Sequence, residues 1–408
     1  MTTLSPAQIM LAAALVVGLA TACQVLAPRL RVPALLLLLP AGFVLGWIAP
    51  EFQMDKVLGP AFGVAVDLMV AIILFQGGLE LGNISLQGKD RSIVRRLVWI
   101  GGPINWIACT LLAHYLLGLS WPLAFLLGAI LIVSGPTVVT PILDFAKPQQ
   151  RVRGILLWEG TMLDPIGGIF AIVIFQVVRV TTMESPLDAI VSLIASFAIA
   201  IVMALVGAVI AVLGTKLVRG NILLGTQVIF GTVVGCAAFA NFLADASGLL
   251  TALLLGIAAP RIAKRLNTSL DHAMPFFNTI ATIGLGILFI SIAALVPSPL
   301  VGQVALPAVA MAVILILIVR PAITAISTAG SDLSRNQRTF IAWMDPRGIV
   351  AAATASSVSA TLIAANVPGA GELLPAAFVI IAVTVFVYGL TAAPVAKVLG
   401  VRDDTPVS

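Results

Sequence analysis

Long apolar windows, separated by short polar or charged loops, recur along the whole chain. A transmembrane helix needs about 20 mostly apolar residues. The pattern therefore predicts an all-α polytopic membrane protein with about thirteen transmembrane helices. The windows fall at 6–25, 33–50, 61–82, 96–117, 121–142, 154–178, 189–213, 221–242, 247–260, 274–296, 299–320, 338–364 and 373–396.

Basic residues are distributed unevenly between the loops on the two sides of these windows. Of the 22 Lys and Arg residues, 19 lie in alternate loops or in the C-terminal tail, and the opposite loops hold only Lys56 and Arg179. Cytoplasmic loops carry the excess of basic residues. We therefore expect a multi-pass protein of the cell inner (cytoplasmic) membrane, with its N-terminus outside and its C-terminus in the cytoplasm. No positively charged segment precedes the first window, so we expect a retained helix and not a signal peptide.

Two of the windows contain helix-breaking residues. The fifth reads LLGAILIVSGPTVVTPIL, with Gly135-Pro136, and the twelfth reads FIAWMDPRGIVAAATASSVSA, with Pro346-Arg347-Gly348. Proline removes a backbone donor and clashes with the preceding turn, so both helices should unwind there. Unwound backbone at membrane depth persists only where it lines a cavity enclosed by protein. Because the windows are seven apart, they should run in opposite directions, as crossing broken helices of two inverted repeats do.

Composition excludes several classes of function. Hydrophobic residues make up 60% of the 408 and charged residues 10%, whereas a soluble domain has about 25% charged residues. No GxGxxG or P-loop occurs, which excludes transport driven by nucleotide hydrolysis within this chain. The three cysteines and two histidines are not spaced as metal ligands, and the histidines cannot form a catalytic dyad. The net charge of +5 is explained by basic residues in the loops and is not a sign of nucleic-acid binding. We expect no enzyme activity, no cofactor and no nucleic-acid partner.

Asp164 lies in the apolar run WEGTMLDPIGGIFAIVIFQVV, at a depth where a charged carboxylate is costly. Burial disfavours the charged form, so such a group can exchange a proton for a metal ion near neutral pH. The alternative is a structural role, as a cap on a half-helix or as the partner of a buried cation. We predict that Asp164 binds the transported ion, Na⁺ or K⁺.

Glu159 and Arg347 also lie inside apolar windows. A buried arginine stays charged and needs a partner. We expect Glu159 and Arg347 to form a structural ion pair between the sixth helix and the broken twelfth. Asp345 is nearer to Arg347 in sequence and is a competing partner. Glu159 is five residues from Asp164, about 7.5 Å along a helix, and should point to a different face.

Hydroxyl and amide groups could complete an ion site around the first break. Ser134 and Thr137 flank the break, Thr161 lies in the run around Asp164, and Gln76 lies in the run LFQGGLEL. Their oxygens are hard ligands of the kind that suits a small alkali cation. Hydroxyls in transmembrane helices often bond their own backbone instead, which is the alternative for each of them.

These residues resemble the monovalent cation:proton antiporter superfamily, in particular the NhaP-like sodium/proton exchangers. RVPALLLLLPAGFVLGWIAP and LFQGGLEL resemble the family's second and third helices, and SGPTVVTPIL lies where exchangers show a Thr-Asp-Pro break. WEGTMLDPIGG lies where they show Glu-Ser-x-x-Asn-Asp, and MDPRGIV resembles the Arg-Gly run of the second broken helix. Together these runs span most of the chain.

The resemblance implies a homodimer in which a core domain of six helices moves against a dimerisation domain. We place the core domain at 96–178 and 299–396, and the dimerisation domain at 1–95 and 179–298. The resemblance also assigns ion binding to Asp164 and the interhelical ion pair to Glu159 and Arg347.

Three positions depart from the family pattern. Gly135 replaces the aspartate of the first break, Leu163 replaces the asparagine before the ion-binding aspartate, and Gly160 replaces a serine. The site therefore has fewer oxygen ligands than the usual exchanger.

The function we predict is electroneutral exchange of a monovalent cation, Na⁺ first, for H⁺ at Asp164, with a role in pH homeostasis. A K⁺/H⁺ exchanger of the same fold is the first alternative. A cation channel or gated leak is a second alternative, since helix breaks and a single acid would also serve one. A membrane enzyme is disfavoured because the catalytic groups are missing.

Overall fold

The structure of the chain is a computed structural model that describes residues 5–30, 32–59, 61–83, 90–183, 186–218, 221–244 and 247–403. Over these residues the chain is helical and contains no β-strand, apart from one isolated bridge between Pro148 and Arg402.

Ten helical runs in the described residues are long and apolar enough to cross a membrane. Three shorter apolar helices, α2 (Leu35–Ile48), α7 (Trp121–Ile130) and α17 (Ile349–Ala364), occupy the remaining predicted windows. The chain is thus a multi-pass membrane protein, and its helices agree with the predicted all-α fold of about thirteen spans. The long runs are α1 (Pro6–Leu30), α4 (Ala61–Asn83), α5 (Asp90–Arg96) with α6 (Gly102–Leu117), α9 (Gln150–Met183), α10 (Pro186–Leu217), α11 (Ile222–Leu243), α12 (Ser247–Arg265), α13 (Met274–Leu295), α14 (Ser298–Ile314) with α15 (Arg320–Ser327), and α18 (Leu373–Val398).

Local sequence signals set the ends of several helices. Gly118, with φ +70°, follows α6 in the left-handed conformation that glycine adopts at helix C-termini. The side chain of Asn221 accepts a hydrogen bond from the Leu224 amide and caps α11. Ser334 and Gln337 form a capping box at the start of α16 (Arg335–Trp343).

The chain divides into two compact units. Unit 1 comprises Met1–Gly59, Leu86–Ala171 and Gly286–Ser408, and unit 2 comprises Pro60–Ser85 and Ile172–Leu285. Unit 1 contains both broken helices and the charged residues singled out in the sequence. The division into a moving core and a dimerisation domain concerns motion and assembly, and it stays a prediction.

Both predicted helix breaks are present in unit 1. α7 ends at Ile130 and α8 (Pro136–Ala146) begins at Pro136, while α16 ends at Trp343 and α17 begins at Ile349. The first break therefore spans 131–135 and the second 344–348. Proline explains both positions, because it can begin a helix but cannot donate a hydrogen bond within one.

A matching irregularity lies in the helical run that precedes each broken helix in the chain. One turn of π-helix, Leu97–Gly101, joins α5 to α6, and a second, Leu315–Val319, joins α14 to α15. A proline follows each turn by two residues, Pro103 in the first run and Pro321 in the second. These runs are the fourth and eleventh spans, again seven apart. The repeated device agrees with the predicted pair of inverted repeats.

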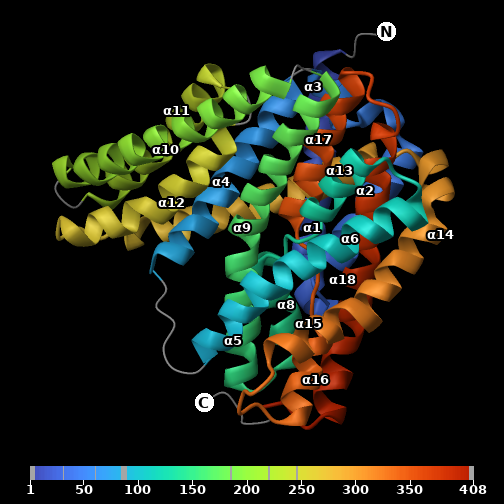
Figure 1. Ribbon diagram of the computed structural model, residues 1–408. Helices are drawn as coiled ribbons and strands as arrows, with labels where there is room; N and C mark the ends of the chain where they lie inside the picture. The colour runs from blue at the N-terminus through green and yellow to red at the C-terminus, as the bar shows by residue number, and fades with distance from the viewer. Residues whose placement is uncertain are drawn as a thin grey trace. The chain divides into compact units, whose positions relative to one another are not determined.

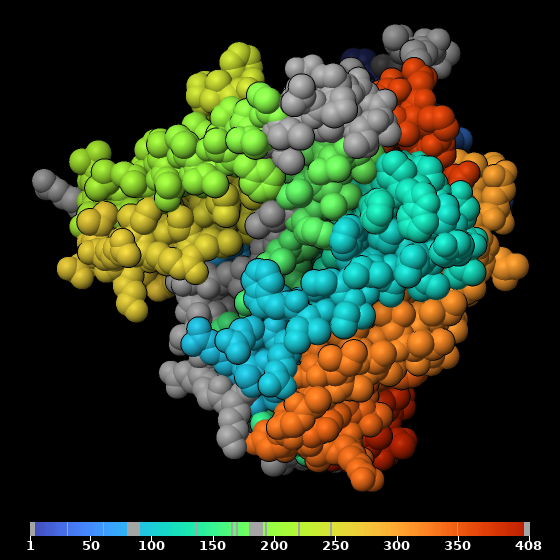
Figure 2. Space-filling view, viewed as in Figure 1, coloured from blue at the N-terminus to red at the C-terminus, as the bar shows by residue number. Residues whose placement is uncertain are grey.

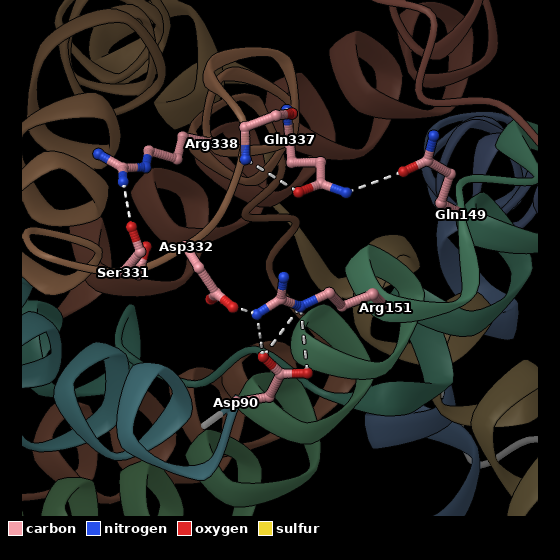
Figure 3. Close-up of polar contacts among 8 residues, drawn as sticks. Asp90, Gln149, Arg151, Ser331, Asp332, Gln337 and Arg338 are labelled. Carbon is pink, nitrogen blue, oxygen red and sulfur yellow. Dashed lines mark hydrogen bonds and ion pairs between the residues drawn. The ribbon is translucent and has the colours of Figure 1, made fainter. Parts of the chain in front are cut away.

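A polar cluster joins three segments of unit 1 at the N-terminal end of α9 (Figure 3). The Arg151 guanidinium donates hydrogen bonds to both carboxylate oxygens of Asp90 and lies 2.6 Å from the carboxylate of Asp332. Gln337 donates to Gln149 at 2.9 Å. Half-exposed ion pairs contribute little each, so the cluster fixes geometry more than it adds stability.

Unit 2 is built on close helix packing. Figure 1 shows α10, α11 and α12 side by side, and α4 packs against α12. Gly78 of α4 and Gly256 of α12 allow these two helices to approach closely. A Cβ at Gly256 would lie 2.3 Å from the Phe75 carbonyl oxygen. One at Gly78 would lie 2.6 Å from that of Leu253. Such contacts between small residues replace the hydrophobic driving force that lipid cannot supply.

We predict that Gly256→Ala lowers the free energy of unfolding by about 1–3 kcal/mol, as overpacking does in other cores. The added methyl group would clash with the backbone of Phe75, which cannot move aside as a side chain can. Thermal melting of the purified protein in detergent measures the effect. Gly231→Ala on α11 is the matched control, because nothing lies within 4 Å of its added methyl group. Equal melting temperatures for the two variants would contradict the packing account.

Candidate functional site

Asp164 lies on the face of α9 that packs against the first helix break. Gly160 and Gly167 lie on the same face, four residues before it and three after. A Cβ at Gly160 would be 3.3 Å from the Ser134 carbonyl oxygen, and one at Gly167 would be 2.9 Å from the Val133 side chain. These glycines allow the backbone of α9 to approach the break. Asp164, which lies between them in the sequence, is therefore placed next to the break.

The Asp164 carboxylate lies directly against Gly135. A Cβ built at Gly135 would lie 2.7 Å from one carboxylate oxygen and 2.9 Å from the other. Gly135 itself is extended, with φ −99° and ψ 153°, so the requirement is for space and not for a special backbone conformation. The lack of a side chain at Gly135 thus leaves room for the Asp164 carboxylate. Asp164 is 5% exposed.

The two breaks touch beside Asp164. The Ser134 hydroxyl donates a hydrogen bond to the Pro346 carbonyl oxygen at 3.0 Å. A Cβ at Gly348 would lie 3.1 Å from the Gly135 backbone nitrogen. The extended segments therefore cross, and buried carbonyl and hydroxyl oxygens gather where they do. Crossing broken helices were predicted from the prolines, and the structure confirms them.

The other predicted ligands have different surroundings. Thr161 is 6% exposed, and its hydroxyl donates to the Leu157 carbonyl oxygen at 2.7 Å, the backbone bond expected of a helical threonine. The side chain of Thr137 lies outside the described residues, although its backbone is in α8. Gln76 belongs to unit 2, where its amide donates to Asn278 at 3.1 Å.

The predicted ion pair between Glu159 and Arg347 is wrong. Arg320, at the start of α15, instead contacts both Glu159 oxygens, at 2.5 and 2.8 Å. The two side chains are only 4% and 5% exposed. A bidentate guanidinium–carboxylate pair satisfies a buried carboxylate better than a single contact does. Glu159 therefore joins α9 to the eleventh span and not to the second break.

Arg347 pairs instead with Asp345, the competing partner that sequence proximity suggested. Their side chains approach to 2.9 Å and are 2% and 8% exposed. Arg347 also donates to the Asn105 side chain of α6 at 3.3 Å. This pair lies within the second break, next to the Pro346 carbonyl that Ser134 contacts.

Arg320 and Asn105 were not among the residues predicted for the site. Arg320 lies in the run LILIVRPAITAIS, and positive-inside counting assigned it to a loop. In the structure α14 and α15 continue as one apolar run, Ser298–Ser327, in which Arg320 is 4% exposed. The apolar residues on both sides of Arg320 were the signal that could have identified it as buried. Asn105 carries no comparable signal.

The chemistry available at this site is that of oxygen ligands. A carboxylate, a hydroxyl and carbonyl oxygens of the two breaks are buried together where the breaks cross. No group of three or more His, Cys, Asp or Glu residues that could hold a metal ion occurs within the described part of the chain. Hard, weakly bound monovalent ions and protons suit such a site better than zinc or another soft metal does.

Comparisons with known proteins identify the family to which the chain is similar. The family described as "Sodium/hydrogen exchanger, transmembrane" matches residues 11–398. The K(+)/H(+) antiporter NhaP2 of Shewanella baltica is 28% identical over 97% of this chain and 68% of its own length. Human sodium/hydrogen exchanger 9B2 is 37% identical over 27% of this chain and 20% of its own. The chain spans about two thirds of the length of its NhaP2 relatives.

The fold is also similar to a solved structure, the sodium proton antiporter MjNhaP1 from Methanocaldococcus jannaschii at pH 8. The TM-score is 0.78, over 96% of this chain and all of the other, at 22% sequence identity. The resemblance to NhaP-like exchangers predicted from the sequence is therefore confirmed. The matching family is a family of transporters. This agrees with the prediction that the chain is not an enzyme.

We predict that Glu159→Ala and Arg320→Ala each lower the free energy of unfolding by about 3–5 kcal/mol, because either leaves a buried charge without its partner. A double-mutant cycle in detergent melting should show strong coupling between them. The same cycle with Glu159 and Arg347 should show little. Strong coupling to Arg347 and none to Arg320 would contradict the pairing.

Proposed function

We propose that this chain, which belongs to the sodium/hydrogen exchanger family, is a secondary-active antiporter that exchanges a monovalent cation for H⁺ at Asp164. The family and the antiporter relatives support exchange of a cation for protons. The contact of the Asp164 carboxylate with the first break supports the position of the site.

The observation that carries the proposal is the charge balance inside unit 1. Five charged residues are buried in the described part of the chain, and all five lie in this unit. Three are carboxylates and two are arginines, so their formal charge is −1. One monovalent positive charge, either a proton or a metal cation, balances the cluster. The five are Glu159, Asp164, Arg320, Asp345 and Arg347.

The two ion pairs indicate which carboxylate exchanges the proton. Arg320 contacts both oxygens of Glu159, and Arg347 contacts Asp345, so each of these carboxylates has an arginine partner. Asp164 lies against the first break, where the two broken helices cross, and it is the carboxylate at which our proposal places the transported ion. A proton and a cation compete for it, and whichever is bound crosses as the protein changes conformation.

Competition at one carboxylate makes the cycle electroneutral. One proton leaves as one monovalent cation enters, so the buried cluster carries no net charge in either loaded state. The empty state carries an uncompensated buried charge, which is costly in a membrane. This cost opposes movement of the empty carrier and favours exchange over uncoupled leakage, which is why we favour an antiporter over a channel.

The transported cation is Na⁺ in our proposal, and K⁺ is the second candidate. The NhaP2 relatives, named as K(+)/H(+) antiporters, favour K⁺, and the similar fold of a sodium proton antiporter is compatible with Na⁺. Gly135, Gly160 and Leu163 leave few side-chain oxygens for a tightly fitted ion. We further propose a homodimer in the cell inner membrane with the N-terminus outside and the C-terminus in the cytoplasm.

Asp164→Asn should abolish cation-driven proton movement while the protein stays folded, because it removes the titrating group and keeps the side-chain size. Proteoliposomes with a trapped pH dye, tested with Na⁺, K⁺ and Li⁺ separately, measure this. Asp144→Asn is the matched control, since that carboxylate is 56% exposed and pairs with Arg153 near the end of α8. Exchange at the wild-type rate in Asp164→Asn would exclude Asp164 as the carrier.

Electroneutral exchange should be insensitive to membrane potential, which acts on net charge moved by roughly 2.3 kcal/mol per charge per 100 mV. Liposomes that show robust dye-detected exchange should give no sustained current on a solid-supported membrane after a pH or Na⁺ jump. A current that scales with protein amount would reveal a second proton carrier. If it disappears in Asp345→Asn, that carrier is Asp345.

A further inference from the structure

A groove between α10 and α12 of unit 2 combines an apolar floor with a basic end. Its cavity volume is about 330 Å³, and it is lined by Ile201 and Leu205 of α10 and by Leu254 and Ile257 of α12. Arg261 and Arg265 line it as well. Figure 2 shows the surfaces of α10, in green, and of the segment around residue 260, in yellow, lying against each other.

A second, more polar cavity adjoins the groove. Its volume is about 550 Å³, and it is lined by Arg261, Lys264 and residues 268–271 of the following loop. Arg261 lines both cavities. The polar cavity can hold a polar group beside hydroxyl and basic side chains. The apolar groove can hold a hydrocarbon chain.

Three basic side chains of α12 line these two cavities. Arg261, Lys264 and Arg265 are exposed, and within the described residues none of them forms an ion pair. One Arg261 nitrogen donates to the Ile257 carbonyl oxygen at 2.7 Å, and a guanidinium has further N–H donors. The acid in the polar cavity is Asp271, which accepts a hydrogen bond from the Ser269 hydroxyl. The lining of the two cavities therefore keeps a positive charge.

We propose that the groove and its basic end bind an anionic phospholipid. Its phosphate lies among Arg261, Lys264 and Arg265, and an acyl chain lies in the groove between α10 and α12. Basic pockets between transmembrane helices bind anionic headgroups in this way. The apolar groove beside the basic group favours a lipid over free phosphate, because inorganic phosphate would leave that groove unused. The site is separate from the proposed exchange site and does not depend on it.

The test is native mass spectrometry of the full-length protein in detergent, titrated with phosphatidylglycerol or with phosphatidylcholine. Phosphatidylglycerol should bind preferentially. The double variant Arg261→Gln and Arg265→Gln should bind it about 25-fold more weakly, since each basic residue near an anionic surface contributes roughly a fivefold factor. The matched control is Arg335→Gln with Lys397→Gln, which removes two exposed charges from unit 1.

A third variant tests the apolar part of the site. Ala258 lines the groove, and Ala258→Phe should fill it, lowering phosphatidylglycerol binding several-fold while all three charges remain. Matching elution volumes on size exclusion establish that the variants are folded. Wild-type lipid binding by the first double variant, or an equal loss in the control, would overturn the proposal. So would displacement of the lipid by equimolar sodium phosphate, which would identify a phosphate site.

Discussion

Two stretches of extended backbone cross in the interior of unit 1, and the polar side chains that they carry are buried. Such backbone survives at membrane depth only when the protein satisfies it. The Ser134 hydroxyl does this for the Pro346 carbonyl, and Gly348 passes close to the Gly135 nitrogen. The glycine face of α9 then packs against the first break and places Asp164 there. The position of the proposed ion site follows from this crossing.

The buried charges follow a second constraint. A buried ion needs a partner, and removing one partner costs more than the pair contributes. Arg320 pairs with Glu159 through two contacts, and Arg347 pairs with Asp345 within the second break. These pairs connect α9 to the eleventh span and stiffen the second break. The five buried charges have a formal sum of −1, and in our account the exchanged proton or cation binds at Asp164.

Much of this arrangement could be predicted from the sequence, because its cause is local. Pro136 and Pro346 cannot continue a helix, so the breaks fall where the sequence indicated. The ion pairs could not be predicted, because any of three carboxylates could meet either arginine. Arg320 was missed altogether, since counting basic residues treats a charge near the end of an apolar window as a loop residue. The Gly135 substitution suggested a lost ligand, and the structure shows space made for the Asp164 carboxylate.

Proton release on cation binding tests the central claim most directly. Purified protein in weakly buffered detergent solution, adjusted to a pH at which the site is protonated, is mixed with Na⁺ or K⁺ while a pH dye is monitored. We predict release of about one proton per bound cation in the wild type and in Asp345→Asn, and none in Asp164→Asn. Unchanged proton release in Asp164→Asn would contradict competition at this carboxylate.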